Sequence, residues 1–241
     1  MPRIDATYWL ALVAASTFGT NTGDFVAKYL HLGHLAGLPY MGLLFAAIVL
    51  SAKWARRAPA LYFWAAIITM RTAATNVADA FQDFDVAYHV SVPLVLTLFA
   101  ASVLFYKRGA RASAGEANTP VNSRYWVAMM LAGILGTVAG DFASFRIGLT
   151  PPVAAVVFGA LILVSIAWFS RRGTLPQPIP YWTTVALIRT AGTAAGDAAA
   201  ILLGLALSTA LTGFAFVALV IYFYGKQSGG RVDLPPHTSR A

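Results

Sequence analysis

The sequence predicts an all-α polytopic membrane protein with eight transmembrane helices, arranged as four tandem two-helix hairpins. Three observations support this prediction: 59% of the 241 residues are hydrophobic, only 11% are charged, and one polar motif recurs four times inside apolar segments. Soluble domains carry about 25% charged residues, so the composition is typical of a chain embedded in lipid. The chain contains no cysteine, which excludes disulfides, thiolate metal sites and thiol catalysis.

The repeated motif reads small-Thr-x-x-small-Asp. Its four copies occupy positions 19–24, 74–79, 136–141 and 192–197, and their Asp residues are spaced by 55, 62 and 56 residues. Sixteen positions before each Asp stands an aromatic residue followed by Trp, as Tyr8-Trp9, Phe63-Trp64, Tyr125-Trp126 and Tyr181-Trp182. Agreement at five positions in four copies indicates an internal repeat, which sets the number of hairpins.

Eight segments have the length of about 17–25 residues that a spanning helix needs. We expect helices at 8–30, 37–54, 61–83 and 90–106 in an N-terminal half (1–118), and at 124–146, 150–169, 180–203 and 205–224 in a C-terminal half (119–224). Residues 225–241 are predicted to form a disordered cytoplasmic tail. Because every repeat has an even number of spans, the repeats share one orientation about an axis along the membrane normal. The predicted symmetry is approximately four-fold, with a pseudo-two-fold relation between the halves.

Basic residues gather on one predicted face of the membrane. Thirteen of the seventeen Lys and Arg residues lie at the chain ends or in the links between hairpins, at 3, 53, 56, 57, 107, 108, 111, 124, 171, 172, 226, 231 and 240. Cytoplasmic loops carry such an excess of positive charge, so we expect both termini to be cytoplasmic. The Tyr and Trp residues at the repeat starts would then form an aromatic belt at that interface.

The motif places its polar groups on one helix face, because residues four apart in a helix lie nearly above one another. These groups are the carboxylates of Asp24, Asp79, Asp141 and Asp197, and the hydroxyls of Thr20, Thr75, Thr137 and Thr193. The small residues at i and i+4 allow close helix approach in lipid. With both faces turned inward, the four motif helices would surround an axis, with Asp and Thr as two stacked layers and the second helices outside.

Intramembrane carboxylates are functional-site candidates by default. We expect the four Asp residues to bind a cation or protons, with the Thr hydroxyls as neutral oxygen ligands. Oxygen ligands suit hard cations such as Mg²⁺, Mn²⁺, Ca²⁺ or Na⁺. The preferred function is a secondary transporter, proton-coupled, for a small cation, with a divalent metal ahead of a monovalent one.

Four basic residues in or beside the motif helices leave two alternatives open: Lys28, Arg71, Arg146 and Arg189. Salt bridges from these residues could neutralise every acid, as in a non-transporting scaffold or sensor. Arg71 and Arg189 could instead clamp an anionic substrate, as in an organic-acid carrier. In the outer turns, His31 and His34 are spaced i, i+3 and could ligate a metal with Asp83 or Asp85, although histidines in such turns are more often solvated.

Enzyme activity is not expected, because the sequence lacks a nucleotide-binding loop, an H-E-x-x-H motif and a serine nucleophile setting. No cofactor is expected. The basic residues occur in short clusters between apolar runs, which does not favour a nucleic-acid partner. The expected partners are membrane lipid and a small ion or molecule, and the sequence leaves the oligomeric state open.

The four hairpins, each with small-Thr-x-x-small-Asp and a leading Trp, resemble a bacterial family of four-repeat membrane proteins, described as a repeat of unknown function. The resemblance covers about residues 8–224 and implies a bacterial inner-membrane location, without implying a substrate. Thr22-Gly23-Asp24 and Lys28 are also similar to the paired Glu-x-Gly-Asp-Lys-Thr motifs of cation/proton exchangers. This chain lacks their Glu and has four copies where they have two, so the similarity favours a cation as the ligand and implies no more.

Overall fold

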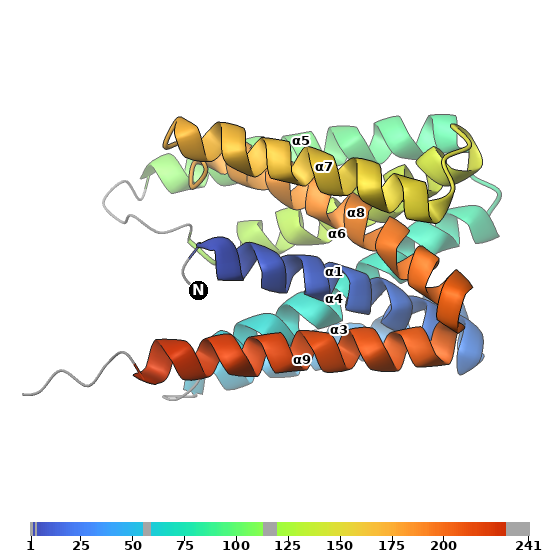
Figure 1. Cartoon of the computed structure of the whole chain (residues 1–241), viewed down its shortest axis with the longest axis horizontal. Helices are drawn as coiled ribbons and strands as arrows, with labels where there is room; N and C mark the ends of the chain where they lie inside the picture. Colours follow the sequence, from blue (N-terminus) through green and yellow to red (C-terminus); the bar gives the residue numbers. More distant parts are fainter. Residues whose placement is uncertain (1, 3, 55–58, 113–119, 230–241) are drawn as a thin grey trace, which may run out of the picture.

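The computed structural model describes residues 2, 4–54, 59–112 and 120–229 (Figure 1). In this part of the chain the protein is all-helical, with eight long helices. They are α1 (Ala6–Asp24), α3 (Leu38–Trp54), α4 (Pro59–Asp83), α5 (Tyr88–Ala112), α6 (Ser123–Phe145), α7 (Pro151–Arg171), α8 (Pro178–Leu203) and α9 (Leu205–Gly229). A π-helix, η1 (Phe25–Tyr29), extends α1, and the short helix α2 (Gly33–Ala36) precedes α3.

Each predicted helix corresponds to one of these long helices. The largest differences are at two C-terminal ends. Helix α5 continues from the predicted end at 106 to Ala112, and α9 continues to Gly229, inside the segment predicted to be a disordered tail. The remainder of that tail, 230–241, and residues 113–119 of the central link lie outside the described residues.

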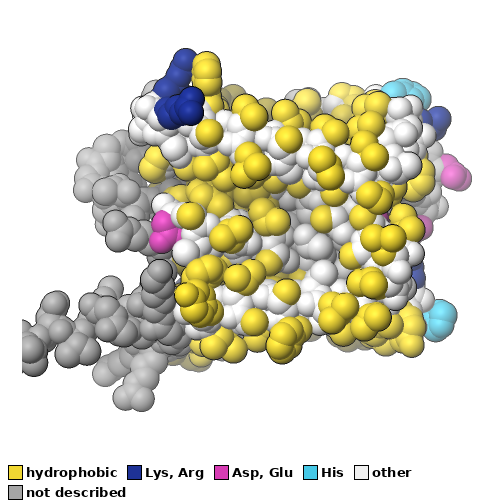
Figure 2. All heavy atoms as spheres, in the orientation of Figure 1, with side chains coloured by type: hydrophobic (Ala, Val, Ile, Leu, Met, Phe, Trp, Pro, Cys, Tyr) yellow, Lys and Arg dark blue, Asp and Glu magenta, His cyan; other side chains and the backbone are white. Residues whose placement is uncertain are grey.

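Six helical segments are long and apolar enough to cross a membrane: 33–54, 88–109, 123–145, 151–171, 178–203 and 205–223. Helices α1 and α4 are not among them, and both carry several polar residues of the repeat, including Arg71 and Asp79 in α4. Figure 2 shows hydrophobic side chains over the middle of the visible face, with the charged and His side chains gathered at its two ends. This distribution is consistent with a multi-pass membrane protein.

Local sequence signals explain where several helices begin and end. The Asp5 carboxylate accepts the Tyr8 N–H at 3.0 Å, and the Asn122 side chain accepts the Tyr125 N–H at 3.1 Å. The same type of N-cap therefore starts two motif helices at the same repeat position. Helix α8 ends at Leu203 and is followed by Gly204, whose positive φ of 79° is readily adopted by glycine. The chain then enters α9 at once.

The four motif helices form the centre of the bundle. Each packs against two others in the cyclic order α1, α4, α6, α8. The outer helices are placed one step further round: α3 packs on α4, α5 on α6, α7 on α8, and α9 on α1. Figure 1 shows α9 alongside α1, so the last helix closes against the first. The two helices of one predicted hairpin mostly pack on other partners, and each outer helix covers the next motif helix.

Small residues of the motif make this central packing possible. A Cβ atom on Gly19 would overlap the Arg71 side chain of α4, and one on Gly136 would overlap Arg189 of α8. On α8, a Cβ atom on Gly192 would overlap Ser16 of α1. Each small residue therefore contacts the residue that stands eight positions before Asp on the next helix. Close approach of this kind is the usual basis of helix association in lipid.

Candidate functional site

The motif residues of all four helices line one cavity. It has a volume of about 400 Å³, and its walls include the four repeat aspartates and the four motif threonines. The other lining residues are Lys28, His34, Gln82, Asp83, Tyr88 and Phe145. Asp24, Asp79, Asp141, Asp197 and their threonines are thus brought together from segments far apart in sequence. We call this end of the central bundle the aspartate end.

The aspartates have unequal partners. The Asp24 carboxylate accepts a hydrogen bond of 2.6 Å from Lys28 Nζ, and Asp79 Oδ2 lies 3.7 Å from His34 Nε2. Across the described chain, no Lys, Arg or His nitrogen lies within 4.0 Å of the carboxylate of Asp141 or Asp197. Five carboxylates, with Asp83, therefore share the cavity with one Lys and one His, and its lining favours a positively charged ligand.

Arg71 does not line this cavity but binds threonines that do, and it is 1% exposed. Its guanidinium donates to the hydroxyls of three motif threonines on three different helices, at 2.6 Å to Thr20, 2.9 Å to Thr137 and 2.7 Å to Thr193. It also donates to the Gly133 carbonyl at 3.1 Å. In this conformation the threonine layer binds the protein's own cation. The sequence placed these hydroxyls beside the aspartates but did not identify Arg71 as their partner.

Each motif threonine also donates to the carbonyl four residues earlier in its helix, over 3.0–3.4 Å. A hydroxyl has one proton and two lone pairs. With the proton directed at the helix backbone, the hydroxyls of Thr20, Thr137 and Thr193 present lone pairs to Arg71. The fourth threonine, Thr75, follows Arg71 by four residues on the same helix, and its hydroxyl donates to the Arg71 carbonyl at 3.2 Å.

Arg189 occupies the same repeat position as Arg71 but contacts different atoms. It is also 1% exposed, and its Nη2 donates to the Met129 sulfur at 3.0 Å. Its Nε and Nη1 form no hydrogen bond with any described residue. Met129 precedes the motif aspartate of α6 by twelve residues, so Arg189 extends away from the aspartates while Arg71 extends towards them. Neither arginine has a carboxylate within 4.0 Å in the described part of the chain.

The aromatic residues at the repeat starts meet at the opposite end of the bundle. The Tyr181 hydroxyl lies 2.5 Å from that of Tyr8 and 3.0 Å from that of Tyr125, and the Phe63 ring packs against both Tyr8 and Tyr125. All four side chains are buried. The prediction of an interfacial aromatic belt is therefore wrong for these residues, because they fill the centre of the bundle. We call this the tyrosine end.

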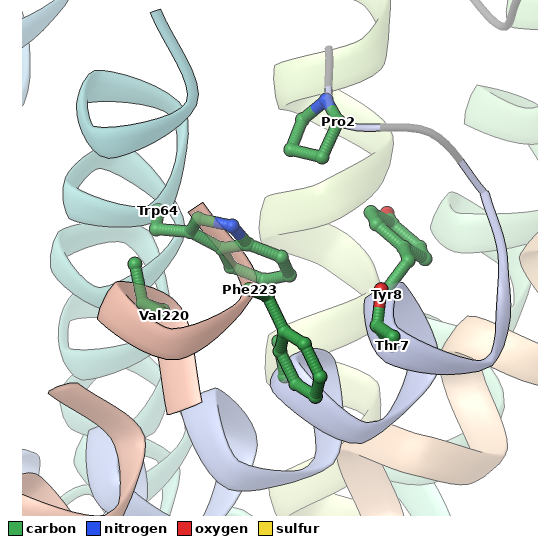
Figure 3. Close-up of a pocket in the computed structure, with 7 residues that line it drawn as sticks. Pro2, Thr7, Tyr8, Trp64, Val220 and Phe223 are labelled. Carbon is green, nitrogen blue, oxygen red and sulfur yellow. The ribbon is translucent and has the colours of Figure 1, made fainter. Parts of the chain in front are cut away.

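Two further hollows adjoin these ends. At the tyrosine end, a crevice of about 20 Å³ is lined by Pro2, Thr7, Tyr8, Ala11, Trp64, Val220 and Phe223 (Figure 3). This volume is of the order of a single water molecule. At the aspartate end, a mostly apolar hollow of about 340 Å³ shares Asp197 and Phe145 with the main cavity. The two ends of the same bundle thus differ greatly in open space.

The turn between α1 and α3 contributes a histidine to the aspartate end. His34 Nδ1 lies 2.6 Å from Asp83 Oδ2, and its Nε2 faces Asp79. His31, the other histidine of this turn, is exposed and has a positive φ of 55°. The predicted basic partner Arg146 lies over the Tyr88 ring at 5.8 Å, and no ion pair is formed by Arg146 with a described residue.

The comparisons with known proteins identify a family for most of the repeat region. Residues 7–58, 124–174 and 180–228 each match the family described as Repeat of Unknown Function (DUF347). The unmatched copy begins at Phe63 and has Ala74 and Ala78 where the others have glycine, although it keeps Thr75 and Asp79. No curated protein and no solved structure matches the chain. Since three matches together cover more than half of the sequence, the chain belongs to the Repeat of Unknown Function family.

Proposed function

We propose that the protein is a secondary transporter for a small cation, which binds in the cavity of the aspartate end. One observation carries the proposal: four carboxylates from four helices line a single cavity, and two of them have no basic neighbour among the described residues. Clustered like charges destabilise one another unless a cation or protons intervene. A ligand that neutralises them therefore gains binding energy from a pre-formed arrangement.

In this proposal all eight long helices cross the bacterial inner membrane. Helices α1 and α4 are shielded from lipid by the outer helices, so their polar residues face the protein interior, where intramembrane polar groups belong. The basic links favour a cytoplasmic location for both termini. The cavity then opens on the outer side, and the tyrosine end is the inner seal. The repeats are related approximately by a four-fold axis along the membrane normal.

Arg71 supplies the coupling element of the proposed mechanism. Its guanidinium lies between the cavity and the tyrosine end, held by hydroxyls of three helices. A bound cation adds positive charge above Arg71, and protonation of the aspartates has the same electrostatic effect. Cations and protons thus compete for the same carboxylates, which is the basis of proton coupling. Passage towards the tyrosine end requires the hydrogen bonds of Arg71 to break.

The anion-carrier alternative uses both Arg71 and Arg189 as the clamp. Because Arg71 is bonded to threonine hydroxyls, this alternative depends on Arg189, whose Nε and Nη1 are buried without a hydrogen-bond partner among the described residues. Its surroundings do not favour this function as strongly, because the wide cavity is at the other end and is lined by acids. The scaffold alternative requires Asp–Arg pairs, whereas the nearest hydrogen-bond partners of Arg71 are threonine hydroxyls and a carbonyl.

Thermal unfolding with a panel of cations tests the proposal. A ligand that binds the folded state stabilises it by about 2.7 kcal/mol at a concentration of 100 times Kd. We expect a cation-dependent rise in Tm in the wild type and its loss in the Asp141→Asn/Asp197→Asn double variant. Asp85→Asn is the matched control, because Asp85 is an exposed turn residue outside the cavity lining.

Two outcomes would contradict the proposal. Absence of any cation-dependent shift in the wild type would exclude a cation site of useful affinity. For oxygen-preferring cations such as Mg²⁺, Mn²⁺ or Na⁺, a shift that persists in the double variant would place the site elsewhere. Uptake by proteoliposomes, with the same variants, then separates transport from binding alone.

A further inference from the structure

The mouth of the acidic cavity contains three side chains with the arrangement of a metal site. One ligand atom each from Asp24, His34 and Asp79 can be chosen so that all three lie within 4.8 Å of one another. Ligand atoms around a tetrahedral ion with bonds of about 2.0–2.1 Å lie about 3.3 Å apart. Small side-chain movements therefore suffice to bring these groups onto one ion, without displacement of a helix.

The orientation of His34 is the observation that distinguishes this site from a simple acidic cluster. Its Nδ1 is hydrogen-bonded to Asp83 at 2.6 Å, and its Nε2 is buried and has no hydrogen-bond partner among the described residues. With the proton on Nδ1, held by the Asp83 carboxylate, the Nε2 lone pair is directed towards Asp79. Metal-binding histidines are usually oriented by a carboxylate or carbonyl on their other nitrogen in this way.

Lys28 provides a built-in competitor for the metal. Its Nζ bonds the Asp24 carboxylate at 2.6 Å, while 57% of its side chain is exposed. A divalent ion that binds Asp24 must displace this ammonium group, and exposure allows Lys28 to move into solvent when that happens. The two carboxylates and a neutral His34 then balance the two charges of the ion.

From this geometry we propose that Asp24, His34 and Asp79 form a binding site for a divalent transition-metal ion, with Asp83 as the positioning residue for His34. An imidazole with two carboxylates favours Zn²⁺, Co²⁺ or Ni²⁺, whereas Mg²⁺ and Ca²⁺ prefer oxygen ligands alone. The proposal rests on the cation transport proposed above and narrows its substrate class. The ion would be the first-bound cargo at the cavity mouth, on the way to Asp141 and Asp197.

Cobalt spectroscopy of the purified full-length protein tests the site directly. Co²⁺ bound in a low-symmetry site with a nitrogen ligand absorbs visible light much more strongly than aqueous Co²⁺. We expect a saturable visible band in the wild type that Zn²⁺ abolishes by competition. His34→Gln should lose the band, and Asp83→Asn should weaken the affinity by about 10–100-fold, the usual effect of removing an orienting partner.

Matched controls separate the site from general effects on folding. His31→Asn removes a neighbouring histidine of the same turn that does not line the cavity, and it should leave the Co²⁺ band unchanged. Lys28→Met removes the competing ammonium group and should tighten Co²⁺ binding. The Tm of every variant without metal is measured alongside. A wild-type band that survives in His34→Gln, or weaker binding in Lys28→Met, would overturn the assignment.

The outcomes also distinguish this proposal from the more general one. If Mg²⁺, Mn²⁺ or Na⁺ raises the Tm through Asp141 and Asp197 but Co²⁺ gives no band, the His34 site is wrong and the cation transporter stands. If no cation of any class raises the Tm or binds, both proposals fail. If His34→Gln abolishes Co²⁺ binding but keeps the response to oxygen-preferring cations, both are supported.

Discussion

The two ends of the central bundle place the same four helices in opposite chemical environments. At the tyrosine end, the hydroxyls of Tyr8, Tyr125 and Tyr181 satisfy one another within 2.5–3.5 Å, beside a crevice of about 20 Å³. At the aspartate end, four carboxylates surround about 400 Å³. Hydroxyls can donate to and accept from each other, but ionised carboxylates only accept. The tyrosine cluster therefore satisfies its own hydrogen bonds. The aspartate cluster requires a positively charged partner.

The two buried arginines extend this contrast into the middle of the bundle. Arg71 is held by three threonine hydroxyls and the Gly133 carbonyl on the aspartate side. Among the described residues, the Arg189 guanidinium donates only to the Met129 sulfur, on the tyrosine side. Hydrogen bonds thus hold the positively charged side chain of Arg71 in place beside the acidic cavity. Arg189 is equally buried but leaves two of its nitrogens, Nε and Nη1, without a hydrogen-bond partner among the described residues, which costs free energy.

Substitution of the arginines by lysine should sharpen this contrast with the largest effect. Hydrogen bonds from a charged group contribute about 1.5–3 kcal/mol each, and an ammonium group cannot reproduce the planar fork that spans three helices. We expect Arg71→Lys to lower the free energy of unfolding by at least about 2 kcal/mol, and Arg189→Lys by clearly less. Unfolding of both variants in the same detergent gives the comparison, and equal losses would contradict it.

Helix contact at the level of the arginines gives the next largest effect. Alanine at Gly136 would overlap Arg189, and forcing extra atoms into a packed interface destabilises by about 1–3 kcal/mol. The matched control is Gly159→Ala in α7, where an added Cβ meets no atom within 4 Å. Alanine there should stabilise by up to about 1 kcal/mol, because glycine is a poor helix former. The difference in Tm between the two variants tests the packing.

Removal of one hydroxyl at the tyrosine end should have the smallest effect. Tyr181→Phe removes the two hydrogen bonds that link Tyr181 to Tyr8 and Tyr125. The hydroxyls of Tyr8 and Tyr125 already lie 3.5 Å apart and can bond each other, so we expect a net loss of about 1 kcal/mol. Tyr222→Phe is the control, since Tyr222 is 63% exposed. Cation binding should stay at the wild-type level in both variants. A changed ion response in Tyr181→Phe would show that the two ends are coupled.

Sequence reasoning predicted the helices and the convergence of the motif residues well. The repeat fixed which faces are equivalent, and helical periodicity placed Thr20 and Asp24, with their counterparts, on one face. These features depend on spacing within a helix, which is visible in one dimension. The membrane orientation and the pairing of the halves stay predictions.

The features that sequence reasoning missed depend on contacts between helices. Arg71 and Arg189 stand at the same repeat position, so no pattern within a repeat shows that they extend in opposite directions. The tyrosines were assigned to an interface because amphipathic rings are common there, and their mutual hydrogen bonds appear only when four helices meet. The sequence named His34 with Asp83 as candidate metal ligands, and the structure brings these two side chains together. The proximity of His34 to Asp79 depends on the packing of α2 against α4, which no spacing within the chain shows.

The position eight residues before each motif Asp has a consequence for how such a protein can be built. Going round the bundle, it holds Ser16, Arg71, Gly133 and Arg189, so that a small residue alternates with a large cation. Four identical subunits of one hairpin each would place four arginines, or none, at a single level. Two identical half-proteins could alternate small residues with arginines. The two arginines would then have equivalent surroundings and would extend in the same direction along the bundle. With all four repeats in one chain, each copy can carry a different residue at this position. The single chain can therefore place its two arginines in different directions, which a symmetric assembly of identical chains cannot do.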